Sequence, residues 1–368
     1  MGNLLEMIDL STSDTKLNEI SEKIINNERL TFDDGVYLFE SNDFYSLGKM
    51  ANYAKNKISG NKVYFVLNRH INPTNICVLS CNFCDFAKKT GDPDAYEMTP
   101  EEILGKIDKD ISEIHIVGGH HPTWKFEYYE NIVKEIHQKF PHIQIKGFTA
   151  AEIDYFWRRW KIDPEESLAR LKEAGLASMP GGGAEVFSPR IHKMLLPGKS
   201  NSSRWLEIHK TAHTMGIKSN CTILYGHLET YEERIDHLIQ LRDLQDETDG
   251  FLAFIPLQYQ IGDTHLRKNK ISPIEDLKMI SVSRLMLDNI PHIKSYWVTI
   301  GESTASVGLN FGADDLDGTI GEEKIMHAAS ASSPAGLART KMISLISEAG
   351  KIPVERDALY NEVKTYAY

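Results

Sequence analysis

Apolar residues follow two different patterns along the chain. Over the first 60 residues they recur at the spacing of an amphipathic helix, as at Leu17, Ile20 and Ile24, and no strand-like run interrupts them. Beyond that point, short runs rich in β-branched residues alternate with longer amphipathic stretches. Such alternation is typical of βα repeats that build a parallel sheet. The pattern therefore predicts an N-terminal helical cap over residues 1–60 and an α/β domain after it.

Eight strand-sized runs follow the cap, with helical stretches between them. The runs are Ile71–Cys77, Glu113–Gly119, Gln144–Ala150, Ser178–Gly182, Ser219–Gly226, Phe251–Tyr259, Lys294–Gly301 and Leu309–Asp315. The helical stretches lie near residues 99–109, 126–139, 164–174, 202–215, 230–247 and 273–290. Eight strands with intervening helices predict a closed (β/α)8 barrel of the TIM type over residues 61–320. A short Ser-rich connection separates the last two runs, so a six-stranded open barrel is the alternative.

The remaining residues, 321–368, are predicted to form a C-terminal helical extension packed on the barrel. In such a barrel the active site forms where strands end and βα loops begin. Residues just after each predicted strand are therefore the candidates for chemistry.

Composition narrows the class of protein. The chain has 41 Lys and Arg against 52 Asp and Glu, a formal net charge of −11, which argues against a surface that binds nucleic acid. The longest uncharged apolar stretches, such as Phe251–Tyr259, fall far short of the roughly 20 residues that cross a bilayer. The first residues lack the basic and then apolar pattern of a signal peptide. We therefore expect a cytoplasmic protein that acts on small molecules.

Three of the four cysteines fall within eight residues, just after the first predicted barrel strand. Cys77, Cys81 and Cys84 have the spacing Cx3Cx2C, the reverse of the spread pairs of a disulfide framework. A cubane held by three thiolates leaves one iron without a protein ligand, whereas electron-transfer clusters have four cysteines. The spacing therefore predicts a [4Fe-4S] cluster with one open iron, the arrangement of radical S-adenosylmethionine (SAM) enzymes.

Two alternatives to this interpretation remain. A structural zinc site would need a fourth Cys or His nearby, and core thiols can also cluster by chance. The fourth cysteine, Cys221, lies within a predicted strand and is expected to be a small buried hydrophobe, although it is also a candidate fourth ligand or redox partner.

Resemblance to the radical SAM superfamily gives roles to residues at the other strand ends. Gly118 and Gly119 stand where the superfamily has Gly-Gly-Glu, which binds the methionine amino group, but His120 replaces the Glu. His121 follows as a candidate proton donor or substrate ligand, or as an idle loop residue. The further residues that this resemblance places around SAM are Phe83, Thr149, Glu152, Glu185 and Tyr225.

Two of these residues also have plain structural interpretations. Glu152 is a candidate for holding the SAM ribose or ammonium group, and a candidate catalytic residue together with His121. It also fits a helix N-terminal carboxylate that the helix dipole stabilises. The segment that contains Tyr225 fits a plain helix start at Glu229 and Thr230.

Longer motifs resemble a narrower group, the aminofutalosine synthases of the futalosine route to menaquinone. They are Arg69–Cys77, Gly91–Tyr96, Pro180–Glu185, Phe251–Leu257, Asp288–Lys294 and Ala313–Thr319. The resemblance implies that the 5′-deoxyadenosyl radical adds to 3-[(1-carboxyvinyl)oxy]benzoate and gives 6-amino-6-deoxyfutalosine, methionine and bicarbonate. SAM is then a consumed co-substrate, and a flavodoxin or ferredoxin is the expected reductant.

The expected substrate is a dianion, so the site needs local donors or cations. Candidates by their placement are Arg69, His70, His121 and Arg284. The alternative functions are a related enzyme that abstracts hydrogen, such as cyclic dehypoxanthine futalosine synthase or a deazaflavin F0 synthase subunit, and a non-catalytic iron–sulfur carrier or metal sensor.

Overall fold

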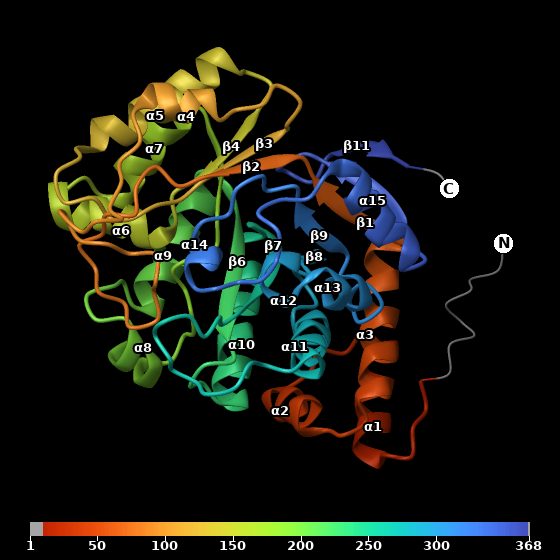
Figure 1. Ribbon diagram of the computed structural model, residues 1–368. Coiled ribbons are helices and arrows are strands. Elements are labelled where there is room, and N and C mark those ends of the chain that lie inside the picture. Colours follow the sequence, from red (N-terminus) through yellow and green to blue (C-terminus); the bar gives the residue numbers. More distant parts are fainter. Residues whose placement is uncertain (1–9, 367–368) are drawn as a thin grey trace.

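Parallel strands form one curved sheet through the centre of the molecule (Figure 1). The computed structural model describes residues 10–366. The strands follow one another in sequence order, and each is parallel to its neighbours. They are β2 (Asn68–Ile71), β3 (Glu113–Ile116), β4 (Gln144–Gly147), β5 (Leu176–Met179), β6 (Lys218–Tyr225), β7 (Phe251–Gln258) and β8 (His292–Ile293). The predicted α/β barrel of βα repeats is confirmed.

Helices cover the outside of this sheet (Figure 1). They are α4 (Pro100–Gly105), α5 (Phe126–Lys139), α6 (Ala150–Trp160), α7 (Pro164–Ala174), α8 (Pro189–Leu195), α9 (Ser202–Thr214), α10 (Tyr231–Thr248) and α11 (Pro273–Met286). Capping boxes begin three of them, at Thr99, Thr149 and Thr230, because each hydroxyl accepts from the backbone N–H three residues on. Hydroxyl caps and N-terminal prolines explain why most of these helices were recognisable in the sequence.

The barrel closes through β9 (Asp315–Gly318), which lies between β8 and β2. Lys294 and Asp315 form a parallel bridge on one side. On the other side the His70 N–H donates to the Ile320 carbonyl at 3.0 Å. The eighth position of the barrel is therefore filled, but by a few hydrogen bonds instead of a continuous ladder.

A second sheet extends the barrel wall with the order β11-β10-β1-β9. Its further strands are β1 (Lys62–Val66), β10 (Ile352–Arg356) and β11 (Glu362–Thr365), and β10 is parallel to β1 in the register Lys62 to Ile352. The predicted helical nature of residues 321–368 is therefore only partly right. This region holds α14 (Ile325–Ala328) and α15 (Arg339–Glu348), but its last part is strand because β10 pairs with the edge of β1.

Three of the predicted strand positions also need correction. The run at 71–77 is mostly loop, because Pro73 has no N–H for the ladder, and the strand lies earlier at β2. The run at 294–301 contains α12 (Trp297–Ile300), since a short apolar run fits a helix turn as well as a strand. The run at 309–315 follows α13 (Glu302–Gly308) as a turn, and the strand begins only at Asp315.

Three N-terminal helices pack against the outer helices of the barrel. They are α1 (Thr15–Ile25), α2 (Phe32–Glu40) and α3 (Phe44–Ser59). The Lys278 ammonium on α11 donates to the carbonyls of Phe39 and Ser41, each at 2.8 Å, and Arg29 pairs with Asp246 and Asp288. Residues 1–9 of the predicted cap and the last two residues of the chain lie outside the described part. The domain boundaries at 60 and 320 stay a prediction.

No helix within residues 10–366 is both long enough and apolar enough to cross a membrane.

One buried ion pair holds α11 to the turn before β9, and it offers a test of the fold. The Arg284 guanidinium donates to Asp314 at 2.8 Å, and neither side chain is exposed. Burial opposes the charge on Asp314, but Arg284 and His292 outweigh it and lower the pKa of this carboxyl to about 2. We expect Arg284→Met, which leaves the buried Asp314 charge without its main cationic partner, to lower the free energy of unfolding by about 3–5 kcal/mol.

Urea unfolding followed by circular dichroism measures this loss. The double variant Arg284→Met with Asp314→Asn is the control, because it removes both charges and is expected to lose less. A single variant that unfolds at the wild-type urea concentration would contradict the role of the pair.

Candidate functional site

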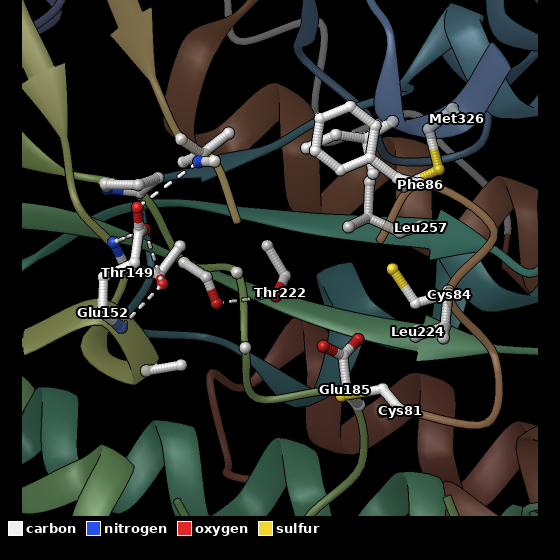
Figure 2. A pocket seen from close by; sticks show the side chains of 18 of the residues that line it. Cys81, Cys84, Phe86, Thr149, Glu152, Glu185, Thr222, Leu224, Leu257 and Met326 are labelled. Carbon is white, nitrogen blue, oxygen red and sulfur yellow. Dashed lines mark hydrogen bonds between the residues drawn. The ribbon is translucent and has the colours of Figure 1, made fainter. Parts of the chain in front are cut away.

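A cavity of about 270 Å³ opens at the carboxyl ends of the barrel strands (Figure 2). Its wall comes from the loops after β2, β3, β4 and β5, from the inner faces of β6 and β7, and from the segment that includes α14. Apolar side chains occupy its middle, namely Phe86, Val117, Leu224, Ile255, Leu257 and Met326. This is the edge at which the sequence predicts the chemistry.

The three clustered cysteines lie on one loop and all line this cavity. The Cys77 N–H donates to Lys88 O at 2.9 Å, and the Cys84 N–H donates to Cys81 O at 3.2 Å. The Lys89 ammonium holds the loop from outside, since it donates to the carbonyls of Cys77 and Leu79 at 2.9 and 2.7 Å. Within residues 10–366, no group of three or more His, Cys, Asp and Glu side chains meets the geometry of a metal-ion site.

A lysine lies beside the thiols. Burial raises the pKa of Cys81 to about 11 and also raises the pKa of Cys84, and the Lys199 ammonium opposes both shifts. Lys199 bonds Glu185 at 2.7 Å and lies 5.6 Å from the centre of the Phe83 ring. Glu185 and Phe83 both line the cavity, as the sequence analysis expects of residues near SAM.

Glycines bring the cysteine loop close to β3. A Cβ atom at Gly119 would lie only 2.2 Å from the Ile76 carbonyl oxygen, and one at Gly118 would lie 3.1 Å from Thr74 O. The Gly119 N–H donates to Thr74 O at 2.9 Å. Both glycines line the cavity, so their first effect is to let the cysteine loop pack against the end of β3.

Glu152 and Thr149 combine a helix cap with a place in the cavity wall. One Glu152 oxygen accepts from the Thr149 N–H and hydroxyl at 2.7 and 2.9 Å, and the other accepts from the Gly118 N–H at 3.3 Å (Figure 2). Glu152 is therefore a carboxylate at a helix N-terminus, as its structural interpretation predicts, and it completes the capping box of α6. Burial raises the pKa of Glu152 to about 7, although these hydrogen bonds oppose the shift.

The two neighbouring histidines lie in different places. His120 lines the cavity, stacks on Tyr155, and has a buried Nδ1 atom without a partner among the described residues. His121 stacks on Trp124 outside the cavity wall, and its Nε2 lies 2.9 Å from a Glu97 oxygen. The geometry gives no support to a catalytic or substrate-binding role for His121.

Three other predicted site residues point away from the cavity. Arg69 pairs with Asp108 on the outside of β2, and Arg284 is enclosed by the pair with Asp314. Tyr225 is buried toward α11, where its hydroxyl donates to Asp276 at 2.7 Å. Side chains alternate along a strand, so Thr222 and Leu224 face the cavity and Tyr225 cannot. Of the four substrate candidates, only His70 lines the cavity.

The far end of the cavity is polar, and most of its residues follow no motif that could be recognised in the sequence. Besides His70, the polar side chains there include His115, Lys146, Asn220, Tyr296, Asp317 and Glu323. The available signal was that two polar residues stand at alternate positions in each of β2, β3 and β4, and His70, His115 and Lys146 are the second of each two. A polar side chain that faces the inside of a barrel is a departure from the usual apolar core.

Comparisons with known proteins agree with this architecture. Residues 71–241 match the radical SAM superfamily, and residues 248–367 match the CofH/MqnC C-terminal region. An aminodeoxyfutalosine synthase of Thermus thermophilus is 42% identical over 362 residues, covering 96% of this chain and 97% of that protein. A 5-amino-6-(D-ribitylamino)uracil–L-tyrosine 4-hydroxyphenyl transferase of Methanopyrus kandleri is 39% identical, covering 88% and 90%.

The fold is also known from solved structures. Methylornithine synthase (PylB) superposes with a TM-score of 0.73 at 18% identity, and the match covers 91% of this chain and 97% of that one. The barrel, the cysteine loop at its carboxyl edge and the relatives over nearly the whole chain agree with one another. The chain belongs to the radical SAM superfamily, in the group that includes the aminodeoxyfutalosine synthases.

Proposed function

We propose that this chain catalyses the aminodeoxyfutalosine synthase reaction of menaquinone biosynthesis. In that reaction 3-[(1-carboxyvinyl)oxy]benzoate, SAM and water give 6-amino-6-deoxyfutalosine, methionine and bicarbonate. The observation that carries the proposal is a single cavity with three thiols at one end and polar side chains at the other. Similarity to synthases of this reaction over nearly the whole chain supports it.

Radical SAM enzymes use a [4Fe-4S] cluster, SAM, a small-molecule substrate and a source of electrons. We assign the cluster to Cys77, Cys81 and Cys84, because the three thiols lie on one loop and line one cavity. The donor set fits, since thiolates are the usual protein ligands of such clusters. When bound, the cluster supplies the electron that cleaves SAM to methionine and the 5′-deoxyadenosyl radical.

The wall around the cysteines is suited to hold SAM. The Glu152 carboxylate is an acceptor for the ammonium group, and the Gly118–Gly119 backbone allows a close approach of the methionyl part. Phe83, Thr149 and Glu185 line the same end of the cavity. Tyr225 is not part of this assignment, because its side chain points to α11.

The apolar middle of the cavity has the task of excluding water. The reacting carbon atoms must be held about 3–3.5 Å apart for the radical to add before it reacts elsewhere. Phe86, Leu257 and Met326 lie together on one side of this zone (Figure 2). We assign the reduction of the cluster to a small electron carrier such as a flavodoxin or ferredoxin.

The cluster assignment predicts selective loss of metal. Replacing Cys77, Cys81 or Cys84 by Ala should lower the content of the anaerobically reconstituted protein from about four iron and four sulfide ions per chain. Cys221→Ala is the matched control, because this thiol is fully buried in β6 and does not line the cavity. Iron and sulfide analysis with the visible absorption spectrum measures the effect. Full cluster content in any of the three variants would refute the assignment.

The Glu152 assignment predicts that SAM affinity depends on pH. A carboxyl group with a pKa of about 7 is neutral below that pH and ionised above it. Only the ionised form attracts the ammonium group fully, so the affinity of the wild-type holoenzyme for SAM should rise between pH 6 and 8. Glu152→Gln should weaken binding at pH 8 by about 10- to 100-fold and flatten the profile.

Equilibrium dialysis with labelled SAM measures both effects. Glu102→Gln is the control, because Glu102 completes the same kind of capping box on α4 but does not line the cavity. A pH profile unchanged in Glu152→Gln would show that Glu152 serves only the helix cap.

Anaerobic turnover with SAM, dithionite and 3-[(1-carboxyvinyl)oxy]benzoate tests the function itself. Mass spectrometry should show 6-amino-6-deoxyfutalosine without an equivalent amount of free 5′-deoxyadenosine. Free 5′-deoxyadenosine in proportion to product would instead favour a hydrogen-abstracting relative, such as cyclic dehypoxanthine futalosine synthase or a deazaflavin F0 synthase subunit. If the reconstituted protein bound no SAM, the result would favour the alternative function of a non-catalytic iron–sulfur carrier.

A further inference from the structure

Three polar side chains lie side by side on the inner wall of the barrel, at the end of the cavity away from the cysteines. His70 on β2 is in register with His115 on β3, and His115 is in register with Lys146 on β4. Residues in register on parallel strands point to the same face, and neighbouring strands lie about 4.8 Å apart. We call these three residues the floor arc.

The floor arc has polar atoms that other side chains do not fully satisfy. The Lys146 ammonium has three N–H groups, and its one acceptor among the described residues is Glu113, at 2.7 Å. His115 Nδ1 lies 3.2 Å from His70 Nε2, which leaves the buried Nε2 of His115 without a partner in the described part of the chain. Lys146 is only 4% exposed, and it lines the cavity, so a ligand bound there can accept from its two spare donors.

Two more polar groups face the same end of the cavity. Asn220 on β6 and Tyr296 after β8 both line it, and they are 4% and 6% exposed. Neither side chain hydrogen bonds to another residue within 10–366. Buried polar groups without partners cost stability. His115 Nε2 and the side chains of Asn220 and Tyr296 lack a partner within residues 10–366, and Lys146 has two spare donors, so together they indicate that a bound molecule completes them.

Asp317 and Glu323, the anionic side chains that line this end of the cavity, already have partners. Asp317 bonds the Lys294 ammonium at 2.9 Å. Glu323 accepts from the backbone N–H groups of residues 325, 326 and 327 at 3.0, 2.7 and 3.3 Å. Lys199, the other lysine in the cavity wall, is bound to Glu185 at the cysteine end. Lys146 is therefore the lysine of the cavity wall at the end away from the cysteines, and its one acceptor, Glu113, leaves two of its N–H groups free to bind a ligand.

We propose that the floor arc, with Asn220 and Tyr296, binds the ring carboxylate of an aromatic substrate, and that Lys146 is its main ligand. This inference rests on the proposed function. The vinyl carbon must meet the radical at the cysteine end, and the enolpyruvyl carboxylate is attached beside it. The ring carboxylate, meta to the ether oxygen, then reaches the opposite end, and the apolar middle of the cavity surrounds the ring.

The test compares three ligands of the reconstituted holoenzyme with SAM and without reductant. They are the full substrate, 3-(vinyloxy)benzoate, which keeps only the ring carboxylate, and 2-phenoxyprop-2-enoate, which keeps only the enolpyruvyl carboxylate. The variant is Lys146→Met combined with Glu113→Gln, because removing Lys146 alone would leave Glu113 charged and buried. Dissociation constants come from isothermal titration calorimetry.

We expect the double variant to bind the full substrate and 3-(vinyloxy)benzoate about 10- to 100-fold more weakly, and 2-phenoxyprop-2-enoate as the wild type does. Arg284→Met with Asp314→Asn is the matched control, since it also removes a buried ion pair but lies outside the cavity. This control should keep the wild-type order of the three affinities. Tyr296→Phe supplies a second, milder variant with the same expected selectivity.

Two results would overturn the inference. Equal weakening for all three ligands, in both test variants, would mean that the floor arc acts only through the fold. If only 2-phenoxyprop-2-enoate bound more weakly, the enolpyruvyl carboxylate would lie at Lys146, and the orientation of the substrate in the cavity would be the opposite of the one proposed. A wild-type holoenzyme that binds none of the three compounds would instead disprove the proposed function, and the assignment of the floor arc with it.

Discussion

Two ion pairs buried inside the barrel determine the character of the cavity. Lys146 bonds Glu113 at 2.7 Å between adjacent strands, and Lys294 bonds Asp317 at 2.9 Å at the seam where the barrel closes. A charge inside a barrel is costly unless a partner of opposite sign and further hydrogen bonds compensate it. Here Asn68 adds one such bond to Glu113. The pairs thus keep one end of the barrel interior polar.

This polar end gives the cavity two chemically distinct halves. The cysteine loop, the glycines after β3 and the Glu152 cap form one half, and the floor arc forms the other. Apolar side chains separate them. A radical reaction needs such a division, because polar contacts must fix the reactants without placing water or a donor of hydrogen atoms between them. The main task of the fold is therefore to position the reactants, and acid–base catalysis is secondary.

Much of the architecture was predictable because it depends on local signals. The period of the apolar residues predicted the βα repeats, and an Asp or Ser cap with Pro at the next position predicted α7 and α11 closely. The spacing of Cys77, Cys81 and Cys84 predicted that they share one loop. β2 was harder because three of its four residues, Asn68, Arg69 and His70, are polar and hide it from a search for apolar runs.

The site residues show where sequence reasoning fails and why. Tyr225 lies on a strand that does line the cavity, but side chains alternate along a strand. Its neighbour Leu224 therefore faces the cavity, and Tyr225 points to α11. Arg284 has the charge that binding of a dianion needs. Its guanidinium is buried in the ion pair with Asp314, however, and does not reach the cavity. Lys146 and His115 carry no motif. Their importance comes from the register of three strands, which only the folded structure displays.

The central claim is that one cavity holds SAM at its cysteine end and the substrate carboxylate at its floor. An anaerobic crystal structure of the unreduced holoenzyme with SAM and 3-[(1-carboxyvinyl)oxy]benzoate tests it most directly. The account predicts the methionyl group beside Gly118 and Glu152, and the ring carboxylate within hydrogen-bond distance of Lys146 Nζ. A ring carboxylate bound beside Lys199, or a substrate outside the barrel, would contradict it.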